Sequence, residues 1–310
     1  MSNAGVLLLN KPVGVRSTRC VERVRKALCD ATAKVGHGGT LDSTASGLLV
    51  LLIGGATRLS GLIVQMPKVY RATFKLGCET TTCDYSGEPL SEKSWEDVCE
   101  SSIDMVIPSF LGWRMQTPPQ VSAVHVGGRR AHEIYRAGGR AKIEPRAVFV
   151  EAIERLTGLS PEGEVSFLIR CGKGTYVRSL ARDMGKLLGC GAHLRALCRE
   201  KVGPFSLKDA LRPGEELDFS SRELVSAIRP LDVMELFLPA YRAPETDMKR
   251  LSNGLGVPLS VGERTTCGSA SPSGVLMFRS ESLMSIGRLE RLGDGGYVLP
   301  EINIATEVVK

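Results

Sequence analysis

A glycine-rich segment, residues 36–47, runs directly into the apolar stretch Leu48 to Ile53. The apolar stretch has the length of a buried strand, and the glycines before it allow the backbone to turn sharply or to be approached closely. Such a segment can cradle a phosphate, form a structural turn, or present Asp42 to a substrate. The order GxxxxGK[ST] of a phosphate loop is absent, which disfavours the first use. The pattern alone does not choose between the other two.

Hydrophobic periodicity predicts a mixture of strands and helices along the chain. The expected strands are residues 6–9, 48–53, 70–76, 148–156 and 165–171. The expected helices are one capped by Ser17 or Thr18, one opened by a Ser94–Asp97 capping box and continuing to about Val106, one from Tyr176 to Leu188, and a basic helix or turn from Ala192 to Arg199.

Two further segments differ in composition from their surroundings. Residues 112–146 are rich in Gly, Pro and Arg, which predicts an exposed loop insertion suited to holding a large partner. After Asp232, prolines separate short apolar runs at 275–278, 283–289 and 297–299, which predicts a small β-rich domain. We therefore expect a catalytic domain of residues 1–238 and a terminal domain of residues 239–310.

Composition narrows the function classes. Nine cysteines without a CxxC pair and four histidines fit neither a disulfide scaffold nor a metal centre, so we expect a reducing cytoplasm and no metal. The longest apolar runs are too short to span a membrane, and the N-terminus lacks the pattern of a secretory signal. Forty basic residues against 34 acidic ones give a net charge of +6, and basic clusters at 129–146 and 173–201 favour a polyanionic partner over a merely solvated face.

Ordered motifs along residues 5–210 resemble the TruB family of tRNA pseudouridine synthases. The matching residues are Lys11-Pro12-x-Gly14, Gly36-His37-x-Gly39-Thr40-Leu41-Asp42 with Ala45 and Gly47, Gly54-x-Ala56-Thr57, Lys68-x-Tyr70-Arg71, Leu76-Gly77 with Thr80, Thr82, Asp84 and Gly87, Gln116-x-Pro118-Pro119, Ser122-Ala123, Gly128-Arg129-Arg130, Lys173-Gly174-Thr175-Tyr176-Val177-Arg178 with Leu180, Asp183 and Gly185, Gly191-Ala192-His193-Leu194, and Val202-Gly203-Pro204-Phe205. The resemblance implies an α+β fold with a mainly antiparallel sheet flanked by helices, and a small PUA-like terminal domain.

The resemblance also implies a reaction that needs no cofactor, in which the uracil of uridine 55 in the T-loop of tRNA is detached and rejoined through C5. Asp42 would be the nucleophile or would stabilise the detached intermediate, and Arg178 would stabilise its ionised carboxylate. Tyr70 would stack on the target base and take part in proton abstraction. From pattern alone, Tyr70 and Asp42 would more often be a core aromatic and a turn residue.

Other site residues follow from the same resemblance. Tyr176 would line the uracil pocket, and His37 would help displace the target nucleotide from its stack. Lys11 would contact phosphate or support the catalytic loop, although an ordinary surface lysine is an equally simple interpretation. Arg129 and Arg130 would bind RNA phosphates. The expected partner is the T-arm of tRNA, with no membrane and no obligate protein partner, and the expected state is a monomer.

The chain departs from the family pattern at several positions. Ser43 follows Asp42 where the family usually has proline, Arg16 replaces a usual threonine, and Val121 and His132 replace aromatic residues. The last two changes affect loop packing and hence RNA affinity.

Three alternative functions remain at this point: a tRNA-binding module without catalysis, a synthase for another RNA with or without protein partners, and small-molecule phosphate chemistry, for which the chain lacks a phosphate loop and metal ligands.

Overall fold

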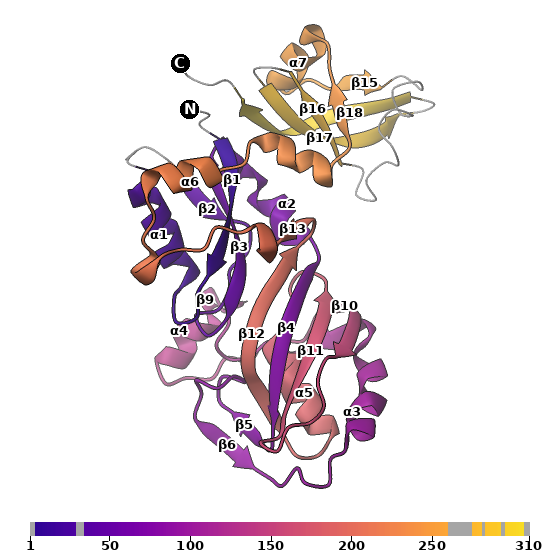
Figure 1. The fold of residues 1–310 in the computed structure, drawn as a ribbon. Helices are drawn as coiled ribbons and strands as arrows, with labels where there is room; N and C mark the ends of the chain where they lie inside the picture. Colours follow the sequence, from indigo (N-terminus) through magenta and orange to yellow (C-terminus); the bar gives the residue numbers. More distant parts are fainter. Residues whose placement is uncertain (1–3, 29–33, 260–274, 281–282, 293–294, 307–310) are drawn as a thin grey trace.

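The computed structural model describes residues 4–28, 34–259, 275–280, 283–292 and 295–306. Its largest element is a nine-stranded sheet with the strand order β1-β3-β12-β4-β11-β10-β7, in which β2 also pairs with β3 and β13 with β12 (Figure 1). The strands are β1 Ala4–Lys11, β2 Val35–His37, β3 Ser46–Gly54, β4 Lys68–Leu76, β7 Gly112–Gln116, β10 Arg146–Arg155, β11 Glu164–Cys171, β12 Ala192–Val202 and β13 Phe205–Ser206. The contact between β12 and β3 is parallel, and the other pairs in this sheet are antiparallel.

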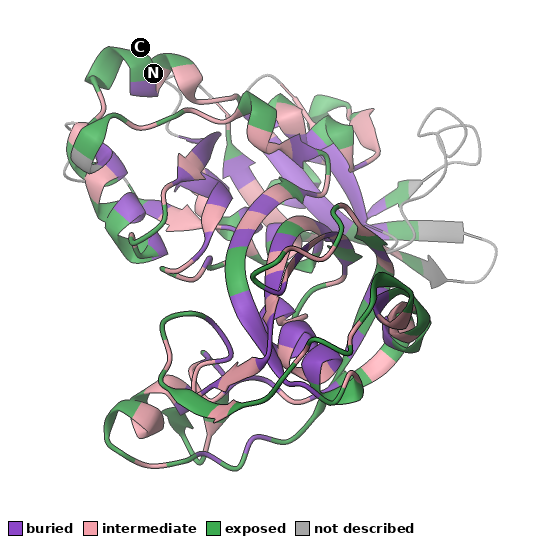
Figure 2. Ribbon diagram, turned by 60° about the horizontal axis from the view of Figure 1, so that its bottom comes forward, coloured by how far each residue is buried: buried purple, intermediate pink, exposed green. Residues whose placement is uncertain are grey.

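Helices cover the sheet where its strands are apolar. The α-helices are α1 Ser17–Ala27, α2 Ser60–Gln65, α3 Glu100–Val106, α4 Ala131–Arg136, α5 Val177–Leu187, α6 Ser221–Ala227 and α7 Glu245–Ser252. Helix α1 buries Cys20, Val21 and Val24 against β1 and β3. Helix α5 buries Leu180 and Met184 on the other half of the sheet, in a cluster that α3 and the paired rings of β4 and β11 complete. In Figure 2 the buried residues follow the strands and the facing side of the helices.

Residues 117–145 form an insertion between β7 and β10. It contains the hairpin of β8 His125–Val126 and β9 Arg129–Arg130, followed by α4. A small separate cluster of buried side chains holds it together: Val124, Ala131, Ala141 and Ile143. A second short pair, β5 Cys78–Thr80 and β6 Pro89–Glu92, lies beside the insertion, at the lower left of Figure 1.

The C-terminal part is a five-stranded sheet with the order β14-β16-β17-β18-β15, and α7 packs against it. Its strands are β14 Ala240–Arg242, β15 Val257–Leu259, β16 Val275–Arg279, β17 Leu283–Leu292 and β18 Gly295–Ala305. One hydrophobic cluster joins it to the large sheet, because Met277, Ile286 and Ile304 pack with Val6 and Leu8 of β1. The Arg58 guanidinium also donates to the Asn303 carbonyl at 2.5 Å. The division at residue 238 therefore stays a prediction, since the two parts share a core.

The mixed α+β architecture agrees with the prediction, but four local expectations are wrong. Residues 192–199 are strand β12 and not a basic helix or turn. The helix expected from Ser94 begins only at Glu100, because the residues after Ser94 form a turn in which the Val98 N–H donates to the Trp95 carbonyl at 2.9 Å. Residues 113–116 belong to strand β7 and not to the exposed loop. The Ser17 hydroxyl does not cap α1 but bonds to the Leu41 backbone.

Among the described residues, no helix is both long and apolar enough to cross a membrane.

Candidate active site

The segment that carries Asp42, residues 38–45, connects β2 to β3 and is held on both sides of this residue. We call it the catalytic segment because Asp42 is the candidate catalytic residue. The Ser17 hydroxyl donates to the Leu41 carbonyl at 2.9 Å and accepts from the Leu41 N–H at 3.0 Å. The Gly14 N–H donates to the Ser43 carbonyl at 2.7 Å. The backbone before and after the carboxylate is therefore fixed by the first helix and by the turn that precedes it, even though Ser43 stands where a proline would restrict it.

Arg178 holds the Asp42 carboxylate. Its Nη2 lies 2.9 Å from Asp42 Oδ2, with the arginine side chain 4% exposed and the aspartate side chain 42% exposed. Arg178 also donates to the carbonyls of Thr82 at 3.1 Å and Val121 at 3.0 Å. A buried guanidinium with fixed backbone partners is a pre-organised anchor, and it leaves the carboxylate accessible from the solvent side.

Asp84 is a second acid beside Arg178. Its Oδ2 lies 3.9 Å from Arg178 Nε, and its side chain is 5% exposed. The hydroxyls of Thr82 and Ser86 each donate to its Oδ1 at 2.6 Å, and Thr44, two residues after Asp42, donates to its Oδ2 at 3.2 Å. Because its acceptor capacity is used by these donors, Asp84 is a support for the arginine and the catalytic segment. In the sequence, Asp84 matches a family motif, but no pattern assigned it a role.

Arg199 lies beneath the same segment. It is 2% exposed, and its guanidinium donates to the carbonyls of Leu48 at 2.8 Å, Thr40 at 3.3 Å and Gly39 at 3.1 Å. Its own backbone approaches Gly47 so closely that a Cβ there would lie 2.4 Å from the Arg199 carbonyl oxygen. Arg199 belongs to the basic cluster of residues 173–201, which was expected to face a polyanionic partner. That assignment is wrong, because the side chain is buried and bound to backbone.

Two tyrosines lie around the carboxylate. Tyr70 of β4 is half-buried and pairs in register with Arg199 of β12. Burial raises the pKa of its phenol, although the Arg199 charge acts in the opposite direction. Burial also raises the pKa of Tyr176, which the charge of Arg178 partly offsets. The Asp42 charge contributes to both shifts, so both phenols lie within its field and stay protonated at neutral pH.

Tyr176, directly before α5, is held by β7 through its backbone and contacts the insertion through its ring. The Gln116 side chain accepts from the Tyr176 N–H at 2.8 Å and donates to its carbonyl at 3.1 Å. Its ring packs against the apolar cluster of the insertion. A movement of the insertion would therefore change the wall of the pocket.

His37 ends β2 and is half-buried, with no hydrogen-bond partner for its buried Nδ1. Burial lowers its pKa, and the Arg199 charge adds to that shift, so the ring is neutral at neutral pH. An uncharged ring suits packing against a displaced base better than binding a phosphate.

Lys11 is fully buried, so the surface-lysine interpretation is wrong. Its ammonium donates to the carbonyls of Pro12 and Val15 at 2.8 Å each. Burial lowers its pKa to about 8, against which the Asp42 charge acts in the opposite direction. In this arrangement the ammonium holds the 11–15 turn, whose Gly14 N–H binds the catalytic segment, and it does not face a phosphate.

Arg129 and Arg130 lie away from these buried groups, on the exposed hairpin of the insertion.

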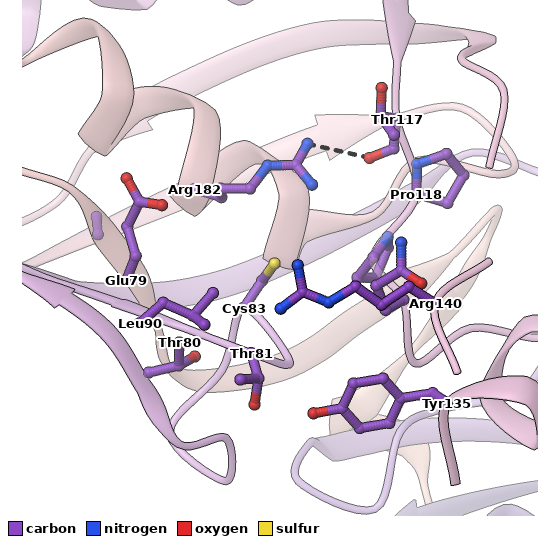
Figure 3. A pocket seen from close by; sticks show the side chains of 13 residues that line it. Glu79, Thr80, Thr81, Cys83, Leu90, Thr117, Pro118, Tyr135, Arg140 and Arg182 are labelled. Atoms are coloured by element: carbon purple, nitrogen blue, oxygen red, sulfur yellow. Dashed lines mark hydrogen bonds between the residues drawn. The ribbon is translucent and has the colours of Figure 1, made fainter. Parts of the chain in front are cut away.

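Beside the site, between the insertion and the β5–β6 pair, a cavity of about 240 Å³ opens (Figure 3). Arg140 and Tyr135 of the insertion and Glu79 of β5 line it, and Arg182 closes one side while donating to the Thr117 carbonyl at 3.0 Å. In the described part of the chain, no three His, Cys, Asp or Glu side chains gather as metal ligands would.

Comparison with known proteins identifies the family. Residues 25–177 match the TruB family pseudouridylate synthase (N terminal domain), and residues 178–234 match the tRNA pseudouridylate synthase B C-terminal domain. The tRNA pseudouridine synthase B of Aquifex aeolicus is 38% identical over 81% of this chain and 85% of its own length. The chain belongs to the TruB family. The tRNA pseudouridine synthase B of Thermobifida fusca is 37% identical over 90% of this chain and 94% of its own length.

The family is one of pseudouridine synthases, so the enzyme class inferred from the motifs is confirmed. A solved Cbf5-Nop10-Gar1 complex contains a chain with the same fold, at a TM-score of 0.71 and 24% identity over 98% of this chain and 85% of that chain. This likeness includes the C-terminal sheet, which lies beyond both matched family domains.

Proposed function

We propose that this TruB-family chain isomerises uridine 55 in the T-loop of tRNA to pseudouridine, acting without an obligate protein partner. The observation that carries the proposal is the accessible Asp42 carboxylate, held at 2.9 Å by the buried Arg178 and flanked by two protonated tyrosines. The names of the relatives, tRNA pseudouridine synthase B, support the RNA class. The T-loop position rests on the motif resemblance.

The target uridine must leave its stack before Asp42 can reach it. The neutral His37 ring, with its unpaired Nδ1, is placed on β2 just before the catalytic segment and would take the space that the base vacates. Extrusion costs a few kcal/mol of stacking, which a substituting side chain offsets. The base would then enter between Tyr70 and Tyr176.

In the pocket, the Asp42 carboxylate acts on the uridine, either as a covalent nucleophile or by stabilising the detached uracil intermediate. Arg178 keeps the carboxylate oriented, and Asp84 fixes Arg178 in turn. Tyr70 stacks on the ring and is in reach of the C5 proton once C5 has bonded to the ribose. The proton at C5 is released to solvent and one is gained at N1, so no oxidant, reductant or leaving group is required.

Tritium release from tRNA transcript labelled with [5-³H]uridine tests the proposal. Wild type should release tritium, and a transcript whose T-loop uridine is replaced should release none. Asp42→Asn should bind tRNA with nearly the wild-type Kd and release no tritium, because the amide keeps the shape and removes the charge. Tight tRNA binding by wild type without any release would instead indicate a binding protein, and an active Asp42→Asn would remove Asp42 from the reaction.

A further inference from the structure

The carboxylate of Asp42 is presented by a tight turn of residues 42–45. The Ala45 N–H donates to the Asp42 carbonyl at 3.1 Å, so Ser43 and Thr44 are the two central residues of the turn. Neither of them has a positive φ, which makes the turn type I. The first central position of such a turn is the one where a proline fixes φ and stiffens the backbone. Serine occupies that position here, so the turn takes its restraint from other groups.

Ser43 provides only part of that restraint. Its carbonyl accepts from the Gly14 N–H at 2.7 Å. Its side chain is exposed and, within the described residues, makes no hydrogen bond. Its N–H likewise donates to no described group. A proline at this position would therefore break no hydrogen bond of the folded chain.

Thr44 provides a second restraint through its side chain. Its hydroxyl donates to Asp84 Oδ2 at 3.2 Å, a bond between residues 40 positions apart in the sequence. Thr44 is half-buried, and the Asp84 side chain is 5% exposed. A hydrogen bond to a buried carboxylate holds its partners firmly, because the acceptor cannot turn to water when the donor is removed.

Asp84 is a rigid attachment point for Thr44. Two hydroxyls of its own turn donate to its Oδ1 at 2.6 Å each. Strand β12 holds the backbone on both sides of it, because the Leu194 N–H donates to the Cys83 carbonyl and the Leu194 carbonyl accepts from the Tyr85 N–H, both at 3.0 Å. The Thr44 hydroxyl therefore ties the turn to the central sheet.

The Thr44 bond also closes a ring around the catalytic carboxylate. Asp84 Oδ2, which accepts from Thr44, lies 3.9 Å from Arg178 Nε, and Arg178 Nη2 lies 2.9 Å from Asp42 Oδ2. Asp42 is thus joined to one support twice, through its side chain and Arg178 and through its backbone and Thr44. Arg178 alone would let the backbone move while the ion pair persists, whereas the two links together fix both ends of the Asp42 side chain.

We propose that Thr44 is a positioning residue for the reaction of Asp42, and that its bond to Asp84 supplies the restraint that a proline at position 43 would otherwise give to the turn. The inference rests on the proposed function, and it adds a residue that acts through Asp42 and Asp84 without touching the substrate. It predicts that positions 43 and 44 control one property, so that a proline at 43 makes the Thr44 hydroxyl dispensable.

A double-mutant cycle tests this coupling. Thr44→Val keeps the shape of the side chain and removes the hydroxyl, and the side chain borders a surface cavity of about 280 Å³ that leaves room for the new methyl group. We expect the single-turnover rate constant of tritium release, with enzyme in excess over tRNA, to fall about tenfold, because small displacements of a catalytic group slow its reaction steeply. The Kd for tRNA should stay nearly unchanged.

Two further variants complete the cycle. Thr44→Ser keeps the hydroxyl and should recover most of the rate. Ser43→Pro should return the rate of Thr44→Val to near that of the wild type, and it should raise the rate of the wild type by a much smaller factor. Additive effects of the two substitutions would overturn the proposal.

Thr73→Val is the matched control. Thr73 borders the same cavity, and its hydroxyl shares a hydrogen bond of 2.8 Å with the hydroxyl of Ser166, away from the turn. This variant loses one threonine hydroxyl as Thr44→Val does, and it should react at the wild-type rate. Thermal unfolding of each variant checks that the rates compare folded proteins.

Amide hydrogen exchange measures the restraint without turnover. In a peptide of residues 38–47, the N–H groups of Leu41 and Ala45 are hydrogen-bonded, to the Ser17 hydroxyl and to the Asp42 carbonyl. Thr44→Val should speed exchange in this peptide, and Ser43→Pro added to it should slow exchange again. Exchange at the wild-type rate in Thr44→Val would contradict the restraint assigned to its hydroxyl.

The outcomes separate this inference from the proposed function. If wild type releases tritium and Thr44→Val does so at the same rate, the inference alone fails. If wild type releases none, the proposed function fails, and hydrogen exchange still decides whether Thr44 restrains the turn. Weaker tRNA binding by Thr44→Val with an unchanged rate constant would make Thr44 an RNA contact and overturn its positioning role.

Discussion

The catalytic segment and the insertion of residues 117–145 both border the pocket, but their cations are used differently. Beneath the catalytic segment, Arg199 and Lys11 are buried and bind backbone carbonyls. In the insertion, Arg129 and Arg130 are exposed, and four small apolar side chains hold the backbone instead. One region uses its cations to fix a reactive group, and the other leaves them available to phosphates. We therefore propose that the basic residues of this enzyme divide into a structural set and an RNA-binding set, and that burial decides which is which.

Removing Arg178, which anchors the Asp42 carboxylate, should have the largest effect on activity. Arg178→Met leaves Asp42 without its ion pair and leaves Asp84 buried beside an apolar side chain. We expect kcat to fall at least about a hundredfold, because a pre-organised charge partner is lost, while tRNA binding stays within a few-fold. Steady-state tritium release at saturating tRNA measures kcat. Arg155→Gln, which removes an ion-paired arginine that contacts Asp104 and Glu100, is the control and should be fully active.

Arg199→Met tests whether a buried cation positions the segment from below. The variant loses three donors to Gly39, Thr40 and Leu48, so those carbonyls lose their partner and the segment loosens. We expect kcat to fall about ten- to a hundredfold, as for a misplaced catalytic group, with little change in Kd. Arg199→Lys should recover part of kcat. Arg195→Met on the same strand, where the arginine is half-exposed and pairs with Glu164, is the matched control.

If Arg199→Met weakened tRNA binding and left kcat intact, the arginine would belong with the RNA-binding set, and the comparison between the two regions would be broken.

The difference between the two sets was the least predictable part of the site. The motifs located Asp42, Tyr70 and Arg178, and apolar patterns located β3, β4 and β11. Arg199 was expected to face RNA because residues 192–199 were expected to form a basic helix or turn, whereas they belong to strand β12. Register shifts after Leu194 and Arg199 break the two-residue alternation of this strand, so buried Leu194 and Leu197 fall three apart, as on a helix face. A bulge of this kind depends on the partner strand, which local sequence does not reveal.

Lys11 and strand β7 show the same limit. A lysine beside a proline turn gives no local sign that β1, β3 and the Val15 carbonyl enclose it. Residues 113–116 were assigned to a loop because their neighbours are rich in Gly and Pro, and only pairing with β10 makes them a strand. In both cases the deciding contacts are distant along the chain.

Removing the charges of Arg129 and Arg130 tests the exposed cations of the insertion, the other half of the comparison. Arg129→Gln combined with Arg130→Gln should weaken tRNA binding several-fold at low salt and reduce the slope of log K against log salt by up to about 2, since two phosphate contacts are lost. The effect should disappear at saturating tRNA. Filter binding across salt concentrations measures both quantities. Lys93→Gln with Lys208→Gln, two exposed lysines outside both basic clusters, should leave the slope unchanged.

An unchanged slope in the Arg129/Arg130 variant would mean that the exposed arginines of the insertion are only solvated.

The smallest effect concerns the pH dependence of stability. Burial lowers the pKa of Lys11 from 10.5 to about 8, so above pH 8 the folded state releases a proton that the unfolded state keeps until about 10.5. The unfolded state then binds more protons, and the free energy of unfolding rises with pH in that window. Wild type should therefore gain stability relative to Lys11→Met between about pH 8 and 10.5. Urea unfolding at several pH values tests this, and parallel curves for the two proteins would contradict it.

The cluster that joins β1 to the C-terminal sheet has a consequence for synthesis on the ribosome. Val6 and Leu8 leave the ribosome early, whereas Met277, Ile286 and Ile304, which complete the same cluster, are translated much later. At about 5–20 residues per second, the first strand waits roughly 15–60 s for its final neighbours. During that interval the cluster lacks the side chains of the C-terminal sheet, so the apolar surface that they will cover is open to a chaperone on the nascent chain.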